Sequence, residues 1–112
     1  MQVNSIQKLM IAIVQEQDVD VAERALGTLG ATLFHLSSTG GFLGRRNATL
    51  LIGLQNGMEK EAIDTLTASC RQRVEYLAIP LEGAAMPLPT PMPVTVGGAT
   101  VFTIPVERFE EF

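Results

Sequence analysis

The stretch KLMIAIVQEQDVDVAERALGTLGATLFHLSS, residues 8–38, changes its hydrophobic pattern twice. After Lys8, residues 9–14 are continuously apolar and include two isoleucines, so residues 8–14 are typical of a buried strand. Residues 31–38 return to strand character after a segment, residues 18–30, that has helical spacing. One face of that expected helix carries Val21, Ala22, Ala25, Leu26 and Leu29. The stretch therefore predicts a strand, a helix and a second strand in succession.

A second unit of the same kind follows. Residues 48–54 and 74–79 read as strands, and residues 58–73 between them place Ala62, Ile63, Leu66 and Cys70 on one helical face. The order βαββαβ is typical of the ferredoxin-like fold, an antiparallel sheet with two helices on one face. Because 112 residues suffice for one compact domain, we expect a single α+β domain over residues 1–112.

Both helices carry start and stop signals. Asp18 or Asp20 can cap the first helix, with Glu23 completing a capping box after Asp20. Asn56 and Glu59 have the same spacing before the second helix. A glycine at position 30 suits the left-handed residue that often ends a helix, so we expect the first helix to end there.

The last third of the chain has a different composition. Residues 80–93 hold five of the six prolines, which predicts a loop because proline lacks a backbone donor. Residues 94–104 read as a strand that Gly97-Gly98 interrupts, either as a hairpin turn or as a bulge. Residues 105–112 are expected to form a short helix that begins near Pro105.

One face of the expected sheet has little to cover it. The two predicted helices occupy the first face, and only the short last helix and residues 80–93 remain for the second. An uncovered apolar sheet face implies association between copies, and a homotrimer is the natural closed form.

Charge and composition exclude several classes of protein. The net charge is −4 and the isoelectric point about 4.8, which argues against a general nucleic-acid binder. The apolar run near the N-terminus is too short for a membrane span, so we expect no membrane insertion. The single cysteine, Cys70, cannot form an intrachain disulfide and is expected to be a structural residue in a cytoplasmic protein.

The segment SSTGGFLGRRN, residues 37–47, is the candidate ligand-binding loop. Its two adjacent glycines can present backbone N–H groups to an anion, and its phenylalanine offers a flat surface to a purine. Its two arginines could hold phosphate, and its asparagine amide can pair with an adenine edge. The candidate residues are Thr39, Gly40, Gly41, Phe42, Leu43, Arg45, Arg46 and Asn47. The alternative is an ordinary loop in which Phe42 and Leu43 cap the core or a subunit interface.

No group of residues suggests catalysis or a metal. The only histidine, His35, lacks a second ligand at metal spacing and is expected on a strand surface or an interface. Glu107, Glu110 and Glu111 are expected to form a solvated face, since no base or nucleophile accompanies them. We therefore predict a protein without enzymatic activity, cofactor or metal.

Three blocks of sequence are distinctive together, namely LMIAIVQEQD (9–18), STGGFLGRRNATLLIG (38–53) and VGGATVFTIPVERFEEF (96–112). In their order and spacing they resemble the PII-like cyclic di-AMP receptor family of bacteria. The resemblance spans residues 9–112 and implies a trimer that binds cyclic di-AMP at each subunit cleft, without catalysis. It also implies that the cleft is lined by Gly41, Phe42, Leu43, Asn47, Gly53 and Phe102.

The chain also departs from the family pattern. Thr32 stands where the family usually has an arginine, and Phe34 where it has a threonine. Gly44 replaces another usual arginine, and Glu111 replaces a glutamine. The resemblance therefore leaves two functions open. One is a cyclic di-AMP sensor that acts on an unidentified downstream protein. The other is a trimeric interaction module that has lost this ligand or binds another small molecule.

Overall fold

The computed structural model describes residues 5–37, 46–80 and 89–112. The elements, in chain order, are β1 (Lys8–Gln15), the 3-10 helix η1 (Glu16–Asp18), α1 (Val19–Thr28), β2 (Thr32–Ser37), β3 (Asn47–Leu54), α2 (Glu59–Cys70), β4 (Arg73–Pro80), β5 (Pro89–Val96) and β6 (Ala99–Pro105). The two predicted helices and the strands that flank them are confirmed, with the helices shorter at their C-terminal ends than expected.

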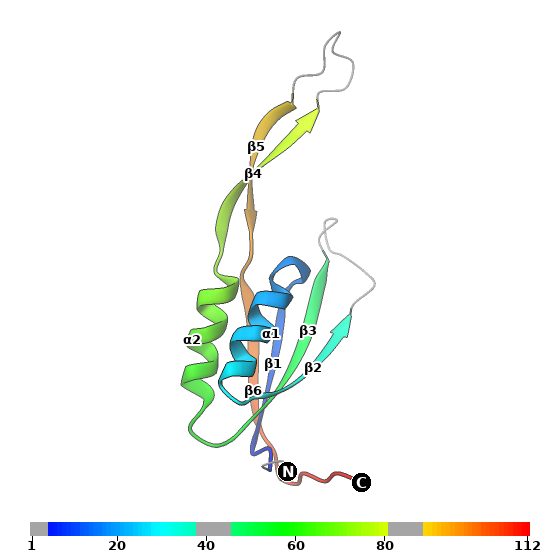
Figure 1. Cartoon of the computed structure of the whole chain (residues 1–112), viewed down its shortest axis with the longest axis vertical. Coiled ribbons are helices and arrows are strands. Elements are labelled where there is room, and N and C mark those ends of the chain that lie inside the picture. The colour runs from blue at the N-terminus through cyan, green and yellow to red at the C-terminus, as the bar shows by residue number, and fades with distance from the viewer. Residues whose placement is uncertain (1–4, 38–45, 81–88) are drawn as a thin grey trace.

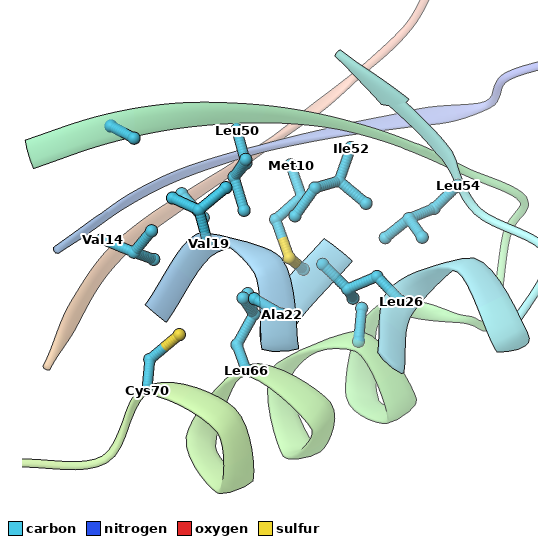
Figure 2. Packing of buried hydrophobic residues seen from close by; sticks show 13 residues of the cluster. Met10, Val14, Val19, Ala22, Leu26, Leu50, Ile52, Leu54, Leu66 and Cys70 are labelled. Carbon is cyan, nitrogen blue, oxygen red and sulfur yellow. The ribbon is translucent and has the colours of Figure 1, made fainter. Parts of the chain in front are cut away.

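Four strands form an antiparallel sheet in the order β2-β3-β1-β6, and both helices pack on one of its faces (Figure 1). Alternate residues of β1 and β3 point toward the helices, as the period of two in a strand requires. The resulting core interleaves sheet and helix side chains (Figure 2). Its largest fully buried members are Met10, Leu26, Leu50, Ile52, Leu54, Leu66, Val14 and Cys70.

The helix faces differ in part from the expected ones. Ala22 and Leu26 of α1 and Ala62, Leu66 and Cys70 of α2 are buried as predicted, but Val21 and Ile63 are exposed. Val19 is buried instead at the first turn of α1.

The fourth strand of the sheet is not the predicted one. The predicted order βαββαβ takes residues 74–79 as the fourth strand of the sheet, but β6 pairs along β1, and β4 leaves the sheet to pair with β5. Val101 of β6 packs against the core, whereas the side chains of Val74 and Tyr76 in β4 are exposed. β6 therefore occupies the edge position beside β1, because its Val101 side chain buries apolar surface against the core. β4 and β5 form a separate two-stranded arm that projects from the body (Figure 1).

The proline-rich segment is not entirely a loop. Residues 81–88 lie outside the described part of the chain, but β4 extends to Pro80 and β5 begins at Pro89. Proline tolerates a strand when its missing N–H would face away from the paired neighbour. Residues 89, 91 and 93 alternate in the strand, so the missing N–H groups of these prolines all lie on the outer edge of β5, and the prediction of a loop over residues 80–93 was wrong for these positions.

Two further predictions are corrected at the C-terminal end. Gly97-Gly98 is neither a hairpin turn nor a bulge, because it joins β5 of the arm to β6 of the main sheet, with both φ angles positive. Residues 106–112 form no helix; β6 runs to Pro105, and the Val106 N–H donates to the Gln7 carbonyl. A helix of about two turns without packing partners is unstable in water.

The helix caps also differ from the expected boxes. The N-caps are Asp18 and Met58, and neither side chain makes a capping hydrogen bond. The Asp18 carboxylate instead binds Arg73. Gly30 does adopt a left-handed conformation, with φ of 82°, just after α1 as predicted.

Candidate functional site

The face of the four-stranded sheet opposite the helices, here called the open face, is strongly apolar. Residues that alternate with the buried ones point to it, and several are about half exposed. Phe34 has 59% of its surface exposed, Phe102 55% and Leu36 53%. The apolar strand residues of this face in the described chain are Leu9, Ile11, Ile13, Phe34, Leu36, Leu51, Phe102 and Ile104.

A row of side chains crosses the open face from one edge to the other. Phe34 of β2 lies opposite Leu51 of β3, Leu51 opposite Ile11 of β1, and Ile11 opposite Phe102 of β6. The two phenylalanines therefore stand at opposite edges of the sheet, separated by roughly 14 Å at three strand spacings. Within one chain they do not form a shared stacking site.

The predicted site residues fall into separate groups. Thr39, Gly40, Gly41, Phe42, Leu43 and Arg45 lie outside the described residues, as does Gly44. Arg46 and Asn47 are at the start of β3, next to the end of β1, where the Glu16 N–H donates to the Arg46 carbonyl at 3.0 Å. Thr32 and Gly53 are paired at the other end of the sheet, about 20 Å along the strand from Asn47.

Gly53 has a clear structural partner in this structure. A Cβ atom placed on it would meet the Ile6 side chain at 2.5 Å, so the glycine leaves room for Ile6 on the open face. A ligand that contacts Gly53 has to displace Ile6, whose side chain ends in rotatable bonds.

Two cavities flank Gln15 at the end of β1 that is close to the candidate loop. The larger, of about 330 Å³, lies between this end of the sheet and the base of the arm. Its lining is Gln15, Glu16, Gln17, Arg46, Leu77, Val94 and Val96. The second, of about 250 Å³, is mainly polar and includes Asn47. Its other lining residues are Ile13, Val14, Gln15, Gln72, Gly97, Gly98, Ala99 and Thr100.

Gln15 connects the two cavities and was not among the predicted site residues. Its side-chain Oε1 accepts a hydrogen bond of 2.7 Å from the Gly97 N–H, and its backbone pairs with Asn47. The sequence signal is that Gln15 lies in the block LMIAIVQEQD, which carries part of the family resemblance. Gln15 of β1 thus contacts both the start of β3 and the base of the arm.

Family comparison identifies the kind of protein that carries this site. A family model described as "Cyclic-di-AMP receptor" matches residues 7–112. The chain belongs to the cyclic-di-AMP receptor family. The resemblance drawn from the three sequence blocks is confirmed.

A solved structure supports the α+β arrangement seen here in this receptor-family chain. It is described as the crystal structure of a functionally unknown protein from Pediococcus pentosaceus ATCC 25745. The two chains are 33% identical, the match covers 97% of this chain and 100% of that one, and the TM-score is 0.76.

The buried carboxylate of Asp18 forms an ion pair that stabilises the fold. Asp18, 3% exposed, accepts hydrogen bonds from Arg73 Nη2 at 2.8 Å and Nη1 at 3.4 Å. The Asp18 carboxylate raises the pKa of the Arg73 guanidinium, which also contacts Glu75. Arg73 is the first residue of β4, so this ion pair ties the base of the arm to the start of α1.

Cys70 and His35 occupy the positions expected of structural residues. Burial, and secondarily the Asp18 charge, raise the pKa of the Cys70 thiol to about 11, so the thiol is protonated at neutral pH. His35 lies on the helix-covered side of β2, with Nδ1 3.6 Å from Glu23 Oε1. Among the described residues no three metal-binding side chains gather, and no helix there is long and apolar enough to cross a membrane.

Proposed function

We propose that the protein is a PII-like signalling receptor that binds cyclic di-AMP in clefts between the subunits of a homotrimer. Binding, without catalysis, changes the surface offered to a downstream protein. The match of the receptor family over residues 7–112 is the observation that carries this proposal. A cytoplasmic location remains the expectation from composition.

The open face supports the trimer. Five large apolar side chains on this face are between 37% and 59% exposed, namely Ile13, Phe34, Leu36, Phe102 and Ile104. Full burial of such a side chain contributes about 1.5–3 kcal/mol, so pairing this face with other copies is strongly favourable. A three-fold arrangement closes the interface on itself and leaves no open apolar face to aggregate.

The separation of the site residues supports a cleft between subunits. Phe34 and Phe102 stand at opposite edges of one sheet, so a ligand that contacts both kinds of edge touches two chains. In this proposal one subunit contributes the loop residues Gly40 to Leu43 with Asn47, and Phe102 lies beneath the ligand. Arg45 or Arg46 supplies charge to the phosphates.

We expect weaker binding of cyclic di-AMP than a typical family member shows. Thr32 replaces an arginine, and loss of one charge-assisted hydrogen bond costs about 1.5–3 kcal/mol, or roughly tenfold to a hundredfold in affinity. Phe34 offers a stacking surface instead, worth about 1–3 kcal/mol per base where it is reached.

The second candidate function is a trimeric interaction module that binds no cyclic di-AMP, or binds another small ligand. Two observations favour it. Apolar Phe34 stands where the family pattern has a polar group, and the Ile6 side chain occupies the surface beside Gly53.

Isothermal titration calorimetry with cyclic di-AMP distinguishes the two functions. We expect saturable binding that Asn47→Ala weakens by at least about tenfold. Asn56→Ala is the matched control, because Asn56 is an exposed turn residue after β3 and is not among the candidate site residues. Absence of heat with cyclic di-AMP and with a panel of adenine nucleotides would favour the interaction module.

A further inference from the structure

The arm formed by β4 and β5 has one edge closed by proline and one edge open. Residue pairing places Pro93 opposite Tyr76, Pro91 opposite Ala78 and Pro89 opposite Pro80. Pairs in an antiparallel ladder alternate between those that exchange two hydrogen bonds and those that exchange none. Because proline has no N–H, the proline pairs are of the second kind.

This alternation fixes the direction of every backbone group in the arm. Glu75–Val94 and Leu77–Met92 exchange the hydrogen bonds that hold the arm together. The N–H and C=O groups of Tyr76 and Ala78 therefore point away from β5, into the space beside β4. On the outer side of β5 the corresponding positions 89, 91 and 93 lack an N–H.

Nothing in the described chain pairs with the outer edge of β4. Its only strand partner is β5, and none of the backbone hydrogen bonds outside the ladders involves residues 74–80. Proteins usually protect a free edge with proline, lysine or a bulge. The chain protects β5 with three prolines, whereas β4 has an unbroken register and no proline before Pro80.

Three of the described side chains along this edge are apolar and exposed, and Glu75 between them is charged. Val74 is 57% exposed and Tyr76 70%, and they share a face of the arm, while Leu77 on the other face is 48% exposed. No charged residue occurs from residue 76 to 80 or from 89 to 98. An incoming strand meets backbone donors and acceptors flanked mainly by apolar side chains, and the one charged side chain among them, Glu75, is paired with Arg73.

We propose that the outer edge of β4 docks an extended segment of a partner protein, which adds to the arm as a third strand. Every second residue of the segment is apolar and packs on Val74 and Tyr76, and the residues between can be polar or apolar. The segment carries no proline at the positions whose N–H groups donate to β4. Main-chain hydrogen bonds provide the affinity and the alternate side chains the specificity. The sheet then has three strands and cannot grow past the outer edge of β5, because the prolines of β5 lack the N–H groups that a further strand needs.

A second copy of this chain is a poorer occupant of the edge. Antiparallel pairing of two β4 strands requires a two-fold axis, which the proposed trimer lacks. The docking proposal does not depend on cyclic di-AMP and goes beyond the proposed receptor function.

Two proline substitutions test the proposal as a matched pair. Ala78→Pro removes an outward N–H from β4, and Thr95→Pro removes one from β5, since Thr95 lies opposite Val74. Neither N–H is used within the arm, so both variants retain the ladder. Retained slow amide exchange at Glu75 and Leu77 verifies that the arm is folded in each.

The probe is a synthetic peptide taken from a displayed library of random nine-residue peptides selected on the full-length protein. Fluorescence anisotropy is expected to show at least about a tenfold loss of affinity with Ala78→Pro and less than a twofold change with Thr95→Pro. Bound peptide is also expected to slow amide exchange at Tyr76 and Ala78. Failure of the library to yield a binder, or equal effects of the two variants, would overturn the proposal. So would slow exchange at Tyr76 and Ala78 in the protein alone, because the edge is then already covered by another copy.

Discussion

Gly97→Ala is expected to be among the most destabilising single substitutions in the described chain, because two separate costs add at this position. Gly97 has φ of 86°, a conformation that costs an L-residue about 1–2 kcal/mol. A Cβ atom there would also press on the Arg71 carbonyl oxygen, a backbone atom that cannot rotate away. We expect a loss of more than about 2 kcal/mol in the free energy of unfolding, the range of strained or overpacked positions.

Two other glycines separate these costs. Gly57 has φ of 91° but open space around its Cβ position, so Gly57→Ala is expected to cost only the strain, about 1–2 kcal/mol. Gly27 lies within α1 with no contact within 4 Å and no positive φ, so Gly27→Ala is expected to stabilise by about 0.5–1 kcal/mol.

Urea unfolding followed by circular dichroism measures all three variants at one fixed protein concentration, because association shifts apparent stability. The expected order of stability is Gly27→Ala, wild type, Gly57→Ala, then Gly97→Ala. If Gly97→Ala were no less stable than Gly57→Ala, the close approach of Gly97 to Arg71 and the described junction between arm and sheet would be wrong.

Three further predictions concern the buried thiol, the buried carboxylate and the open face. The thiol of Cys70, with its pKa raised to about 11, is expected to react with iodoacetamide at pH 8 only as fast as the protein unfolds. Because the pKa of the thiol is higher in the folded than in the unfolded chain, the protonated thiol stabilises the fold below about pH 9, and this stabilisation falls as the pH rises toward 11. Cys70→Ala is expected to lack this decrease of the urea midpoint with pH. An equal decrease in Cys70→Ala and wild type would contradict the raised pKa. Asp18→Asn is expected to lower the free energy of unfolding in urea by about 1.5–3 kcal/mol, because it weakens the buried pair with Arg73. Arg108→Ala removes an exposed ion pair and is expected to leave the urea midpoint unchanged. Equal midpoints for the two variants would refute a structural role for the buried pair. Phe102→Glu is expected to reduce the assembly to monomers by light scattering, while Thr103→Glu on the opposite side of the same strand leaves it intact; an unchanged mass with Phe102→Glu would exclude this face from the interface.

The sequence predicted the elements better than their pairing. The apolar run at 8–14 and the helical spacing at 18–30 identify β1 and α1 because each pattern is local. Whether residues 74–79 or 99–105 lie beside β1 depends on which strand buries a side chain against the helices, and Val101 does so from a position far along the chain. Local sequence patterns do not show which of these two strands pairs with β1.

The proline segment and the candidate site show the same limit. Proline predicts a loop by its missing donor, but three prolines at alternate positions all turn the missing group outward and permit a strand. Arg46 and Asn47 are predicted site residues because of their side-chain chemistry, and the structure places them at the start of β3. Gln15 was missed because its role depends on Gly97, 82 residues away, to which no sequence spacing points.

Native mass spectrometry with cyclic di-AMP tests the receptor assignment most directly, since it reports assembly and ligand count together. We predict a species of three chains that takes up to three cyclic di-AMP molecules, with uptake reduced in Asn47→Ala and unchanged in Asn56→Ala. A trimer that stays free of ligand at concentrations far above those that saturate typical receptors would contradict cyclic di-AMP binding, and a monomer that binds one ligand would contradict a cleft between subunits.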